Sequence, residues 1–379
     1  MSQDRKIRVG ILCGGKSAEH EVSLQSAKNV VEAINKKKYE VVLIGIDKTG
    51  KWYLNESSEF LLNANDPKLI KLSNNSENIA LVPGDREDQL ISLSKLTPMQ
   101  PVDVVFPIIH GTYGEDGTIQ GLLKLAGIPF VGASVLGSAV GMDKDVMKRL
   151  LKEDGILIAD FLVFNRMFQE EIDFENIKNQ LGLPFFVKPA NLGSSVGVSK
   201  VNDEVQFKKA INEAFKYDNK IIIEENINGR EIECSVLGNI ECSVLGNNDP
   251  IASLPGEVLP SHEFYSYEAK YIDENGAALK IPAQLQKKIV NNVQTLAIKS
   301  YKALCCEGMA RVDLFLKDDN EIIINEINTI PGFTNISMYP KLWEASGISN
   351  AELIDRLIQL AIERYESEKR LETSFEAQR

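Results

Sequence analysis

Polar side chains alternate with apolar ones along two neighbouring segments near the C-terminal end. Arg311 and Asp313 are two residues apart in A-R-V-D-L-F-L, and Glu326 and Asn328 are two apart in E-I-I-I-N-E-I-N. In an extended strand, side chains two apart point to the same face. The intervening K-D-D-N is typical of a turn, so the two segments predict an antiparallel hairpin.

The register of this hairpin brings oxygen ligands together. A turn centred on residues 319–320 places Asp313 opposite Glu326. The same register places Arg311 opposite Asn328. Two carboxylates and an amide oxygen suit Mg²⁺, which completes its octahedron with water and phosphate oxygens. The alternative is a solvated hairpin face with an incidental pair of acids, because alternating polar faces are common in antiparallel sheets.

The composition is that of a folded, soluble chain. Its 379 residues are 44% hydrophobic and 25% charged, which predicts two or three compact units. The formal net charge of −12 argues against nucleic acid as the main partner, since binding a phosphate backbone needs a basic surface. A small anionic ligand in a local basic pocket remains compatible with this charge.

Membrane insertion and secretion are not indicated. No apolar run approaches the roughly 18 residues that a membrane helix requires. The opening M-S-Q-D-R-K-I-R leads into a strand pattern rather than a signal peptide, so we expect a cytoplasmic protein. An odd number of cysteines without metal-site spacing predicts reduced packing thiols at Cys13, Cys234, Cys242, Cys305 and Cys306.

The N-terminal part alternates strand and helix patterns. Residues 7–13 and 39–47 are apolar runs typical of strands, and residues 23–35 between them have helical spacing. A further strand pattern at 102–110 precedes a glycine-rich turn and a helical pattern. This alternation predicts an α/β unit with a parallel sheet and functional loops at the carboxyl ends of its strands. Residues 55–100 are rich in Asn, Ser and Glu, and we expect an irregular surface insertion there.

Two α+β units follow. A helical pattern over 144–154 precedes the strand patterns F-L-V-F and P-F-F-V-K-P, a Gly/Ser loop and another helix. K-I-I-I-E-E-N opens a third unit that runs through several strands to the hairpin. We therefore divide the chain into domains at 1–136, 137–220 and 221–379.

Two glycine-rich segments bear on phosphate binding. Residues 10–17, G-I-L-C-G-G-K-S, match the P-loop pattern letter for letter. Gly10, however, interrupts an apolar run that still reads as strand, whereas the first P-loop glycine follows the strand, so we predict an accidental match. Lys188 instead stands at a strand end before N-L-G-S-S-V-G, whose backbone amides can fold over phosphates. A mobile linker is the alternative for that loop.

Two other segments could contact a small polar ligand. Glu19 lies where a strand-end loop passes into a helix, a favourable place for substrate contacts. The alternative is an acid that complements the helix dipole. The strand and connector at 221–231 could present backbone groups to an adenine edge and Glu231 to ribose hydroxyls.

The order of these motifs resembles that of the ATP-grasp superfamily and, closely, of the D-alanine:D-alanine ligases over nearly the whole chain. The matching segments are G-G-K-S-A-E-H-E-V-S, H-G-T-Y-G-E-D-G, M-D-K, V-K-P, G-S-S-V-G, Y-E-A-K-Y, A-R-V-D and N-E-I-N-T-I-P-G. The resemblance implies an ATP-grasp fold, with a Rossmann-like N-terminal domain and two subdomains that enclose ATP.

The resemblance also implies a reaction. ATP phosphorylates the carboxylate of one D-alanine, and the amine of a second attacks the acyl phosphate to give D-Ala-D-Ala for peptidoglycan synthesis. Two Mg²⁺, for which Mn²⁺ can substitute, accompany ATP, and a homodimer is expected. The remaining alternatives are a ligase that makes D-Ala-D-lactate or uses another amine, a P-loop nucleotide switch, and a catalytically silent binding protein.

Residue roles follow from the matched motifs. The metal ligands implied by the resemblance are Asp313, Glu326 and Asn328. The implied nucleotide contacts are Lys144, Lys188, Ser195 and Lys270 for phosphates, with Lys270 on a closing loop, and Glu224, Ile227 and Glu231 for adenine and ribose. A solvated surface lysine is the alternative for Lys270.

The implied substrate contacts lie in other motifs. Arg311 and the Gly332 amide would stabilise the tetrahedral oxyanion. The first substrate's ammonium would meet Glu19, with His110 near it, and the second substrate's carboxylate would meet Ser337. A packed loop histidine is the alternative for His110. Tyr271 resembles the tyrosine that joins Ser194 and Glu19 in relatives with an amine acceptor, which favours D-alanine over D-lactate.

An internal repeat departs from the family pattern. I-E-C-S-V-L-G-N occupies residues 232–239 and recurs letter for letter at 240–247. Because eight is even, either copy could fill one strand without reversing its faces. We expect the first copy in the strand, because it directly follows Glu231, and the second displaced into the following hairpin.

Overall fold

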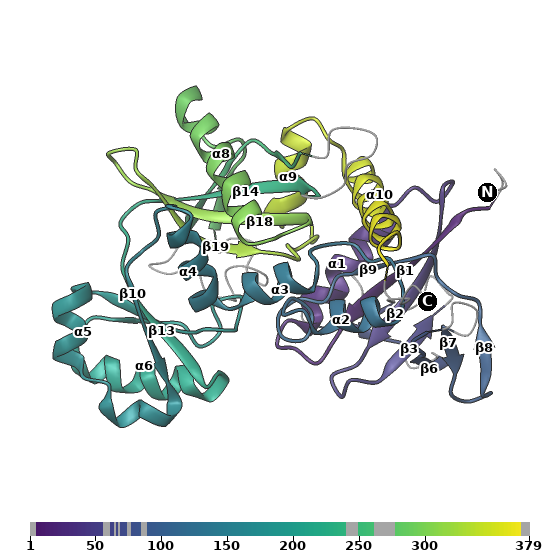
Figure 1. Cartoon of the computed structure of the whole chain (residues 1–379), viewed down its shortest axis with the longest axis horizontal. Coiled ribbons are helices and arrows are strands. Elements are labelled where there is room, and N and C mark those ends of the chain that lie inside the picture. The colour runs from purple at the N-terminus through teal and green to yellow at the C-terminus, as the bar shows by residue number, and fades with distance from the viewer. Residues whose placement is uncertain are drawn as a thin grey trace, which may run out of the picture.

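The computed structural model describes residues 5–55, 61–63, 66, 69–73, 77–84, 89–239, 249–260 and 277–372. Three units, each built on its own sheet, follow one another along the chain (Figure 1). The N-terminal unit lies to the right of Figure 1, the central unit at the lower left, and the C-terminal unit above them. Within the described residues, no helix is both long and apolar enough to cross a bilayer.

A parallel core with an antiparallel extension forms the N-terminal sheet, whose order is β8-β7-β6-β3-β2-β1-β9. The parallel strands are β1 (Ile7–Gly14), β2 (Tyr39–Ile46) and β9 (Val104–Pro107), with α1 (His20–Ala33) between β1 and β2. The antiparallel strands are β3 (Trp52–Asn55), β6 (Glu77–Leu81), β7 (Leu90–Ser92) and β8 (Thr97–Met99). A separate pair, β4 (Leu61–Leu62) and β5 (Lys71–Leu72), lies beside them in sequence.

The expected irregular insertion at 55–100 is therefore wrong in part, because β6, β7 and β8 extend the sheet. These strands are short, and their fully buried apolar residues, Ile79 and Leu90, are isolated in sequence. Backbone pairing along the sheet edge stabilises these strands rather than a run of apolar residues. Their sequences therefore show only a weak strand pattern. The structure supports the interpretation of the P-loop match as accidental. Strand β1 continues through Gly10 to Gly14, and Lys16 is exposed.

The central unit contains a four-stranded antiparallel sheet of order β10-β13-β11-β12. Its strands are β10 (Phe161–Asn165), β13 (Lys220–Glu225), β11 (Phe185–Pro189) and β12 (Ser199–Val201). Helix α2 (Thr118–Leu125) packs Ile119 and Leu123 against the N-terminal sheet and belongs to that unit. Helices α3 (Val135–Met142) and α4 (Lys144–Glu153) lead into the central unit, which contains the 3₁₀ turn η1 (Arg166–Glu171), α5 (Phe174–Leu181) and α6 (Glu204–Tyr217). Because β13 belongs to this sheet, the proposed boundary after residue 220 falls inside it, and the change of sheet comes after Glu225.

The C-terminal sheet runs in the order β17-β16-β14-β18-β19, with β15 also paired to β14. Its strands are β14 (Arg230–Gly238), β15 (Ile251–Ala252), β16 (Gly256–Pro260), β17 (Ala277–Lys280), β18 (Gly308–Leu316) and β19 (Ile322–Asn328). Its helices are α8 (Lys287–Ala303), α9 (Met338–Ala345) and α10 (Asn350–Glu368). Apolar residues of α4 and α8 pack in one core with those of β14 and β18.

Helix α10 ties the C-terminal unit to the N-terminal sheet, and it lies between the two in Figure 1. Buried Arg364 reaches across this interface and donates to the carbonyl oxygens of Gly132 and Phe130, at 2.7 Å each. Ile354 and Leu357 of α10 share a core with Val9 of β1. The C-terminal unit is therefore packed firmly against the N-terminal unit.

The repeated segment has one copy in β14. Residues 232–238 pair with β18, from Ile232 opposite Leu314 to Gly238 opposite Gly308, which confirms the expected register of the first copy. Asn239 then receives a hydrogen bond from the Gly308 amide at 3.1 Å. The second copy, 240–247, lies outside the described residues.

The expected packing thiols are confirmed for three cysteines. Cys13, Cys234 and Cys306 are buried and free of disulfides, while Cys305 is free and exposed. Burial raises the pKa of the Cys13 and Cys234 thiols to about 12, so both stay protonated at neutral pH. Cys242 lies outside the described residues.

Candidate active site

A cavity of about 320 Å³ opens between the central sheet and the C-terminal sheet. Its cationic lining residues, here called the basic wall, are Lys144, Lys188 and Lys200. Its acidic lining residues from β14, β18 and β19, here called the acidic wall, are Glu231, Glu233, Asp313 and Glu326. The glycine-rich loop contributes Gly193, Ser194 and Ser195 to the rim.

The β18–β19 hairpin has the predicted pairs but not the predicted turn. Asp313 pairs with Glu326 and Arg311 with Asn328, as expected. The predicted turn centred on residues 319–320 is wrong. The Lys317 amide bonds to the Glu321 carbonyl oxygen, which leaves three residues in the turn, and Asn320 adopts a left-handed φ of 65°. A bulge after Asp313 shifts the ladder back by one residue. Two irregularities thus cancel, and the polar residues keep a common face.

The candidate metal ligands sit in a setting that fits a cation. The side-chain oxygen of Asn328 is buried and accepts no hydrogen bond from the residues that the structure describes. Asp313 and Glu326 line the cavity beside it, with Lys144 Nζ 3.7 Å from Glu326 Oε2. A buried oxygen without a donor costs free energy, so a cation would complete this set. The described residues hold no group of three His, Cys, Asp or Glu that could bind a metal ion by itself. The candidate set contains only two carboxylates, and its third ligand is the amide oxygen of Asn328.

Arg311 is held by carboxylates on both sides. Its guanidinium makes a two-pronged contact with Asp313, with both N–O distances at 2.7 Å. Glu233, directly opposite Asp313 in β14, lies 2.8 Å from Arg311 Nε. Sequence reasoning missed Glu233, although its two-residue spacing from Glu231 placed it on the same strand face.

Lys144 and Lys188 reach the cavity from different elements. Lys144 begins α4, and its Nζ donates to the Leu192 carbonyl oxygen at 2.7 Å. Lys188, in β11, donates to Glu224 at 2.7 Å. The other Glu224 oxygen accepts from buried Lys148 at 2.8 Å. Sequence reasoning missed Lys148, although it stands one helical turn after Lys144 on the apolar face of α4.

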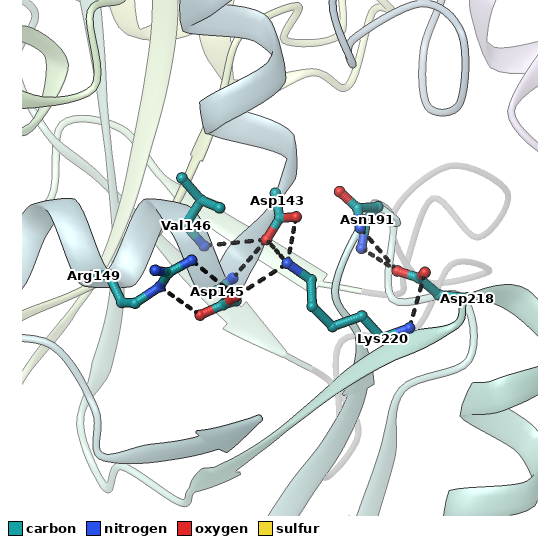
Figure 2. A network of polar contacts seen from close by, with 7 residues as sticks. All are labelled: Asp143, Asp145, Val146, Arg149, Asn191, Asp218 and Lys220. Carbon is teal, nitrogen blue, oxygen red and sulfur yellow. Dashed lines mark hydrogen bonds and ion pairs between the residues drawn. The ribbon is translucent and has the colours of Figure 1, made fainter. Parts of the chain in front are cut away.

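A polar network joins the first turn of α4 to the start of β13 and to the start of the glycine-rich loop (Figure 2). Lys220 Nζ contacts both oxygens of Asp143, at 2.8 and 2.6 Å, and Asp145 at 3.1 Å. Asp143 also caps the first turn of α4. Asp218 accepts from the Asn191 amide at 2.8 Å, which secures the start of the loop.

The loop meets Glu19. Ser194 Oγ donates to Glu19 Oε1, and a Cβ at Gly111 would collide with the same carboxylate. Ser194 and Ser195 both adopt left-handed φ angles, of 53° and 60°, which are uncommon for serine and often mark functional loops. The expected contact between Glu19 and Ser194 is thus present. Tyr271, the third member, and Lys270 lie outside the described residues.

Glu115, from H-G-T-Y-G-E-D-G, was missed as a separate group. It is buried and accepts from the Gly111 amide at 2.6 Å and the Ile330 amide at 3.3 Å. Burial, and then the nearby Glu19 charge, raise the pKa of Glu115 to about 8. The signal in the sequence was the glycine-flanked acid itself, but a sequence does not reveal that it folds inward.

His110 has protein partners on both ring nitrogens. Nδ1 lies 3.0 Å from the Ile330 carbonyl oxygen, and Nε2 lies 3.0 Å from Ser26 Oγ. Burial lowers the pKa of His110 to about 4, so the ring is neutral at pH 7. This geometry matches the packed loop histidine that the sequence left open. Any contact of His110 with substrate stays a prediction.

Gly332 and Ser337 lie together at the start of α9. A Cβ at Gly332 would meet Ser337 Oγ at 2.6 Å, so only glycine allows this approach. Ser337 precedes α9, and its Oγ accepts from the Thr334 amide at 3.0 Å. Ile227, Glu231 and Glu224 all line the cavity.

Comparisons with known proteins identify relatives of this chain. Family models described as D-ala D-ala ligase N-terminus and C-terminus match residues 8–133 and 150–359. A D-alanine–D-alanine ligase of Oceanobacillus iheyensis is 57% identical over 97% of this chain and 99% of its own length. D-alanine–D-alanine ligase A of Escherichia coli is 53% identical over 98% of this chain and 100% of its own.

Solved structures are similar as well. The D-alanine-D-alanine ligase from Coxiella burnetii has a TM-score of 0.82 and 39% identity, covering 96% of both chains. The VanG D-Ala:D-Ser ligase from Enterococcus faecalis has a TM-score of 0.81 and 36% identity, covering 94% of this chain and 100% of its own. Together with the family models that span most of the sequence, these matches show that the chain belongs to the D-alanine–D-alanine ligase family.

Proposed function

We propose that this protein is an ATP-dependent ligase that joins two D-alanine molecules into D-Ala-D-Ala, a building block of peptidoglycan. The observation that carries the proposal is the cavity between two sheets, where Lys144 and Lys188 lie opposite Asp313 and Glu326. A triphosphate with divalent cations complements lysines on one side and carboxylates on the other. The identities of 53–58% to named ligases over nearly the full length support the choice of substrate.

The phosphate end of ATP fits between the walls. Lys144 and Lys188 would bind phosphate oxygens, and the Ser195 amide and hydroxyl would close over them. Asp313, Glu326 and Asn328 would hold two Mg²⁺, or Mn²⁺ in their place. Bound there, the metal ions would neutralise charge on the transferring phosphoryl group.

The nucleoside end would lie towards the connector after β13. Ile227 and Glu231 line that part of the cavity, which supports contacts of a backbone group with adenine and of Glu231 with ribose hydroxyls. Glu224 also lines it, although both of its carboxylate oxygens accept from lysines. A contact of Glu224 with adenine would therefore use the lone pairs that these lysines leave.

The D-alanine end would lie near the glycine-rich loop. Glu19, oriented by Ser194, would bind the ammonium group of the first D-alanine. Arg311 and the Gly332 amide would bind the oxyanion that forms when the second amine attacks the acyl phosphate. Ser337, at the N-terminal end of α9, would bind the carboxylate of the second D-alanine. Lys270 lies outside the described residues; by resemblance to the family it would contact the γ-phosphate from a closing loop that would exclude water.

The expected surroundings of the enzyme belong to the same proposal. A cytoplasmic location would supply ATP and keep the buried thiols reduced. The expected homodimer stays a prediction, which light scattering on the purified protein would test.

A coupled assay of ADP release tests the reaction. ADP release should require both ATP and D-alanine, and mass spectrometry should identify D-Ala-D-Ala as the product. Release that is independent of D-alanine, or a product without a D-Ala-D-Ala mass, would contradict the proposal.

Competition between acceptors tests the predicted role of Tyr271. With D-alanine as first substrate near neutral pH, D-alanine should be used in preference to D-lactate. Equal or greater formation of D-Ala-D-lactate would remove the argument for an amine acceptor.

A further inference from the structure

Lys148 is a buried cation outside the groups with proposed roles. It lies on α4 one turn after Lys144, among the buried residues Met147 and Leu151. Its side chain is 1% exposed, and its Nζ donates to Glu224 at 2.8 Å. Withdrawing an ammonium from water carries a large desolvation cost, which a buried partner repays only when the geometry is good. An apolar residue would pack here without that cost, so the charge itself needs an explanation.

Glu224 is shared between Lys148 and Lys188. Its side chain is 3% exposed, and its two oxygens accept from the two ammonium groups at 2.8 and 2.7 Å. Burial raises the pKa of Glu224, but the charges of Lys148 and then Lys188 lower it by more, so that the pKa is about 2. The carboxylate is therefore ionised at neutral pH. Burial lowers the pKa of Lys148, and the Glu224 charge opposes that shift. With both lysines protonated, the two lysines and the glutamate leave a single positive charge on the cluster.

The two lysines differ in what they can reach. The Lys188 side chain is 15% exposed and lines the cavity, whereas Lys148 is enclosed by protein and is not among the lining residues. The Lys148 ammonium also lies 5.7 Å from the centre of the Phe161 ring, a further favourable contact for a cation. Lys148 is thus fixed, while Lys188 can turn towards a ligand.

Without Lys148, only Lys188 would balance the charge of Glu224, and the pair would be neutral. To bind a phosphate, Lys188 would have to leave a buried carboxylate unpaired, which is strongly unfavourable. With Lys148 present, Glu224 remains paired when Lys188 moves to an anion.

We propose that Lys148 is a charge-balancing residue that keeps Glu224 paired and so makes Lys188 available to the phosphates of the bound nucleotide. It is a positioning residue rather than a catalytic one, because it acts through Glu224. The inference rests on the proposed function for the identity of the ligand.

Nucleotide binding to a Lys148→Met variant tests this role. The dissociation constants of ADP and adenosine are measured by NMR titration, with Lys152→Met as the matched control. Lys152 is an exposed lysine on the same helix. In Lys148→Met, the ADP constant should rise about 10- to 100-fold while the adenosine constant changes less than about twofold. The control should bind both ligands as the wild type does. An unchanged ADP constant, or an equal loss for both ligands, would overturn the proposal.

A second variant separates charge balance from packing. Lys148→Met combined with Glu224→Gln removes one charge of each sign, so Lys188 again carries an uncompensated positive charge. Because Glu224 is also the proposed adenine contact, its loss should weaken ADP and adenosine alike, so the ratio of the ADP constant to the adenosine constant is compared. In the double variant this ratio should return to within about threefold of the wild-type ratio. It also serves if the single variant does not fold, because removing both members of a buried pair is often tolerated. A double variant whose ratio stays as high as that of Lys148→Met, or about tenfold or more above the wild-type ratio when the single variant does not fold, would overturn the role of charge.

The wild-type reaction, recorded on the same preparations, separates the two hypotheses. No D-alanine-dependent ADP release by the wild type would overturn the proposed function, while the titrations would still decide the role of Lys148. Normal release together with unchanged ADP binding in Lys148→Met would overturn only the role of Lys148.

Discussion

The two walls of the cavity carry opposite charges and are built differently. The basic wall is tied down by neighbours, since Lys144 contacts the Leu192 carbonyl and Lys188 contacts Glu224. The acidic wall lies on adjacent strands of one sheet. Asp313 in β18 pairs with Glu326 in β19 on one side and with Glu233 in β14 on the other. Strand register gathers the acids, whereas contacts between distant segments gather the lysines.

The comparison shows how like charges can be gathered at a polyphosphate site without a large loss of stability. Each wall concentrates like charge, which is costly by itself. The structure offsets that cost with one internal counter-charge on each side, Glu224 among the lysines and Arg311 among the acids. The remaining excess on each wall matches the ligand that the proposed function requires.

The largest expected effect comes from the acidic wall. Glu326→Gln should lower turnover by at least about a thousandfold, because a metal ligand loses its charge while its shape is kept. Glu321→Gln, at the other end of β19 beside Lys317, is the matched control and should stay near wild type. Steady-state ADP release at saturating Mg²⁺ measures both. Near-wild-type turnover of Glu326→Gln would remove the metal assignment.

The basic wall should respond through nucleotide affinity. Lys188→Ala should weaken ATP binding about 100-fold, because a phosphate loses its cation in a partly desolvated site. Lys16→Ala removes an exposed lysine of the accidental P-loop match and should change binding less than about twofold. A nucleotide titration ranks the two. The opposite ranking would restore the P-loop interpretation.

A smaller effect should follow from loosening the basic wall. Lys220→Met leaves Asp143 and Asp145 without their shared cation, so α4 and the glycine-rich loop lose a connection. The KM for ATP should rise about three- to tenfold, with little change in the KM for D-alanine. Lys216→Met, which breaks an exposed pair with Glu213, is the control. Equal changes in both KM values would indicate a general loss of structure instead.

His110, a titratable residue outside the walls, should affect the pH dependence of stability. Its pKa of about 4 in the folded protein lies below the ordinary 6.5, so the unfolded chain binds the proton more readily. The corresponding stability is present above pH 6.5 and is lost as the pH falls towards 4. This loss should amount to about 1–3 kcal/mol in the free energy of unfolding.

Urea unfolding at pH 7 and pH 5 measures the effect. His110→Asn should lose less stability than the wild type over this interval, because its side chain does not titrate. Ser26→Ala removes the hydroxyl partner of His110 but keeps the ring, so its pH dependence should resemble that of the wild type. Equal pH dependence in His110→Asn and the wild type would argue against a neutral buried ring.

The smallest effect is expected from the repeat. Deleting residues 240–247 should preserve or slightly raise stability, by up to about 1 kcal/mol, and leave ligase activity intact. The acidic wall needs Glu231 and Glu233, and both precede that segment. Thermal unfolding and ADP release measure the result. A less stable variant, or one with weaker ATP binding, would mean that the second copy has a structural place of its own.

The pattern of the chain determined most of the acidic wall. The two-residue spacing in β18 and β19 set which side chains share a face, and the pairs Asp313–Glu326 and Arg311–Asn328 followed from it. The predicted turn was nevertheless wrong, and a bulge restored the register. Local alternation specifies a face reliably, because its period is fixed by strand geometry, whereas loop length depends on left-handed residues that a sequence signals weakly.

Only the tertiary structure decided the partners of the lysines and buried acids. Lys148 and Glu224 are 76 residues apart, and Glu115 meets Ile330 across 215 residues. The antiparallel edge strands β6–β8 and the place of β13 in the central sheet were likewise decided by long-range pairing. A sequence states which groups can ionise, but burial and distance set their charge and their partners, and both are properties of the packed chain.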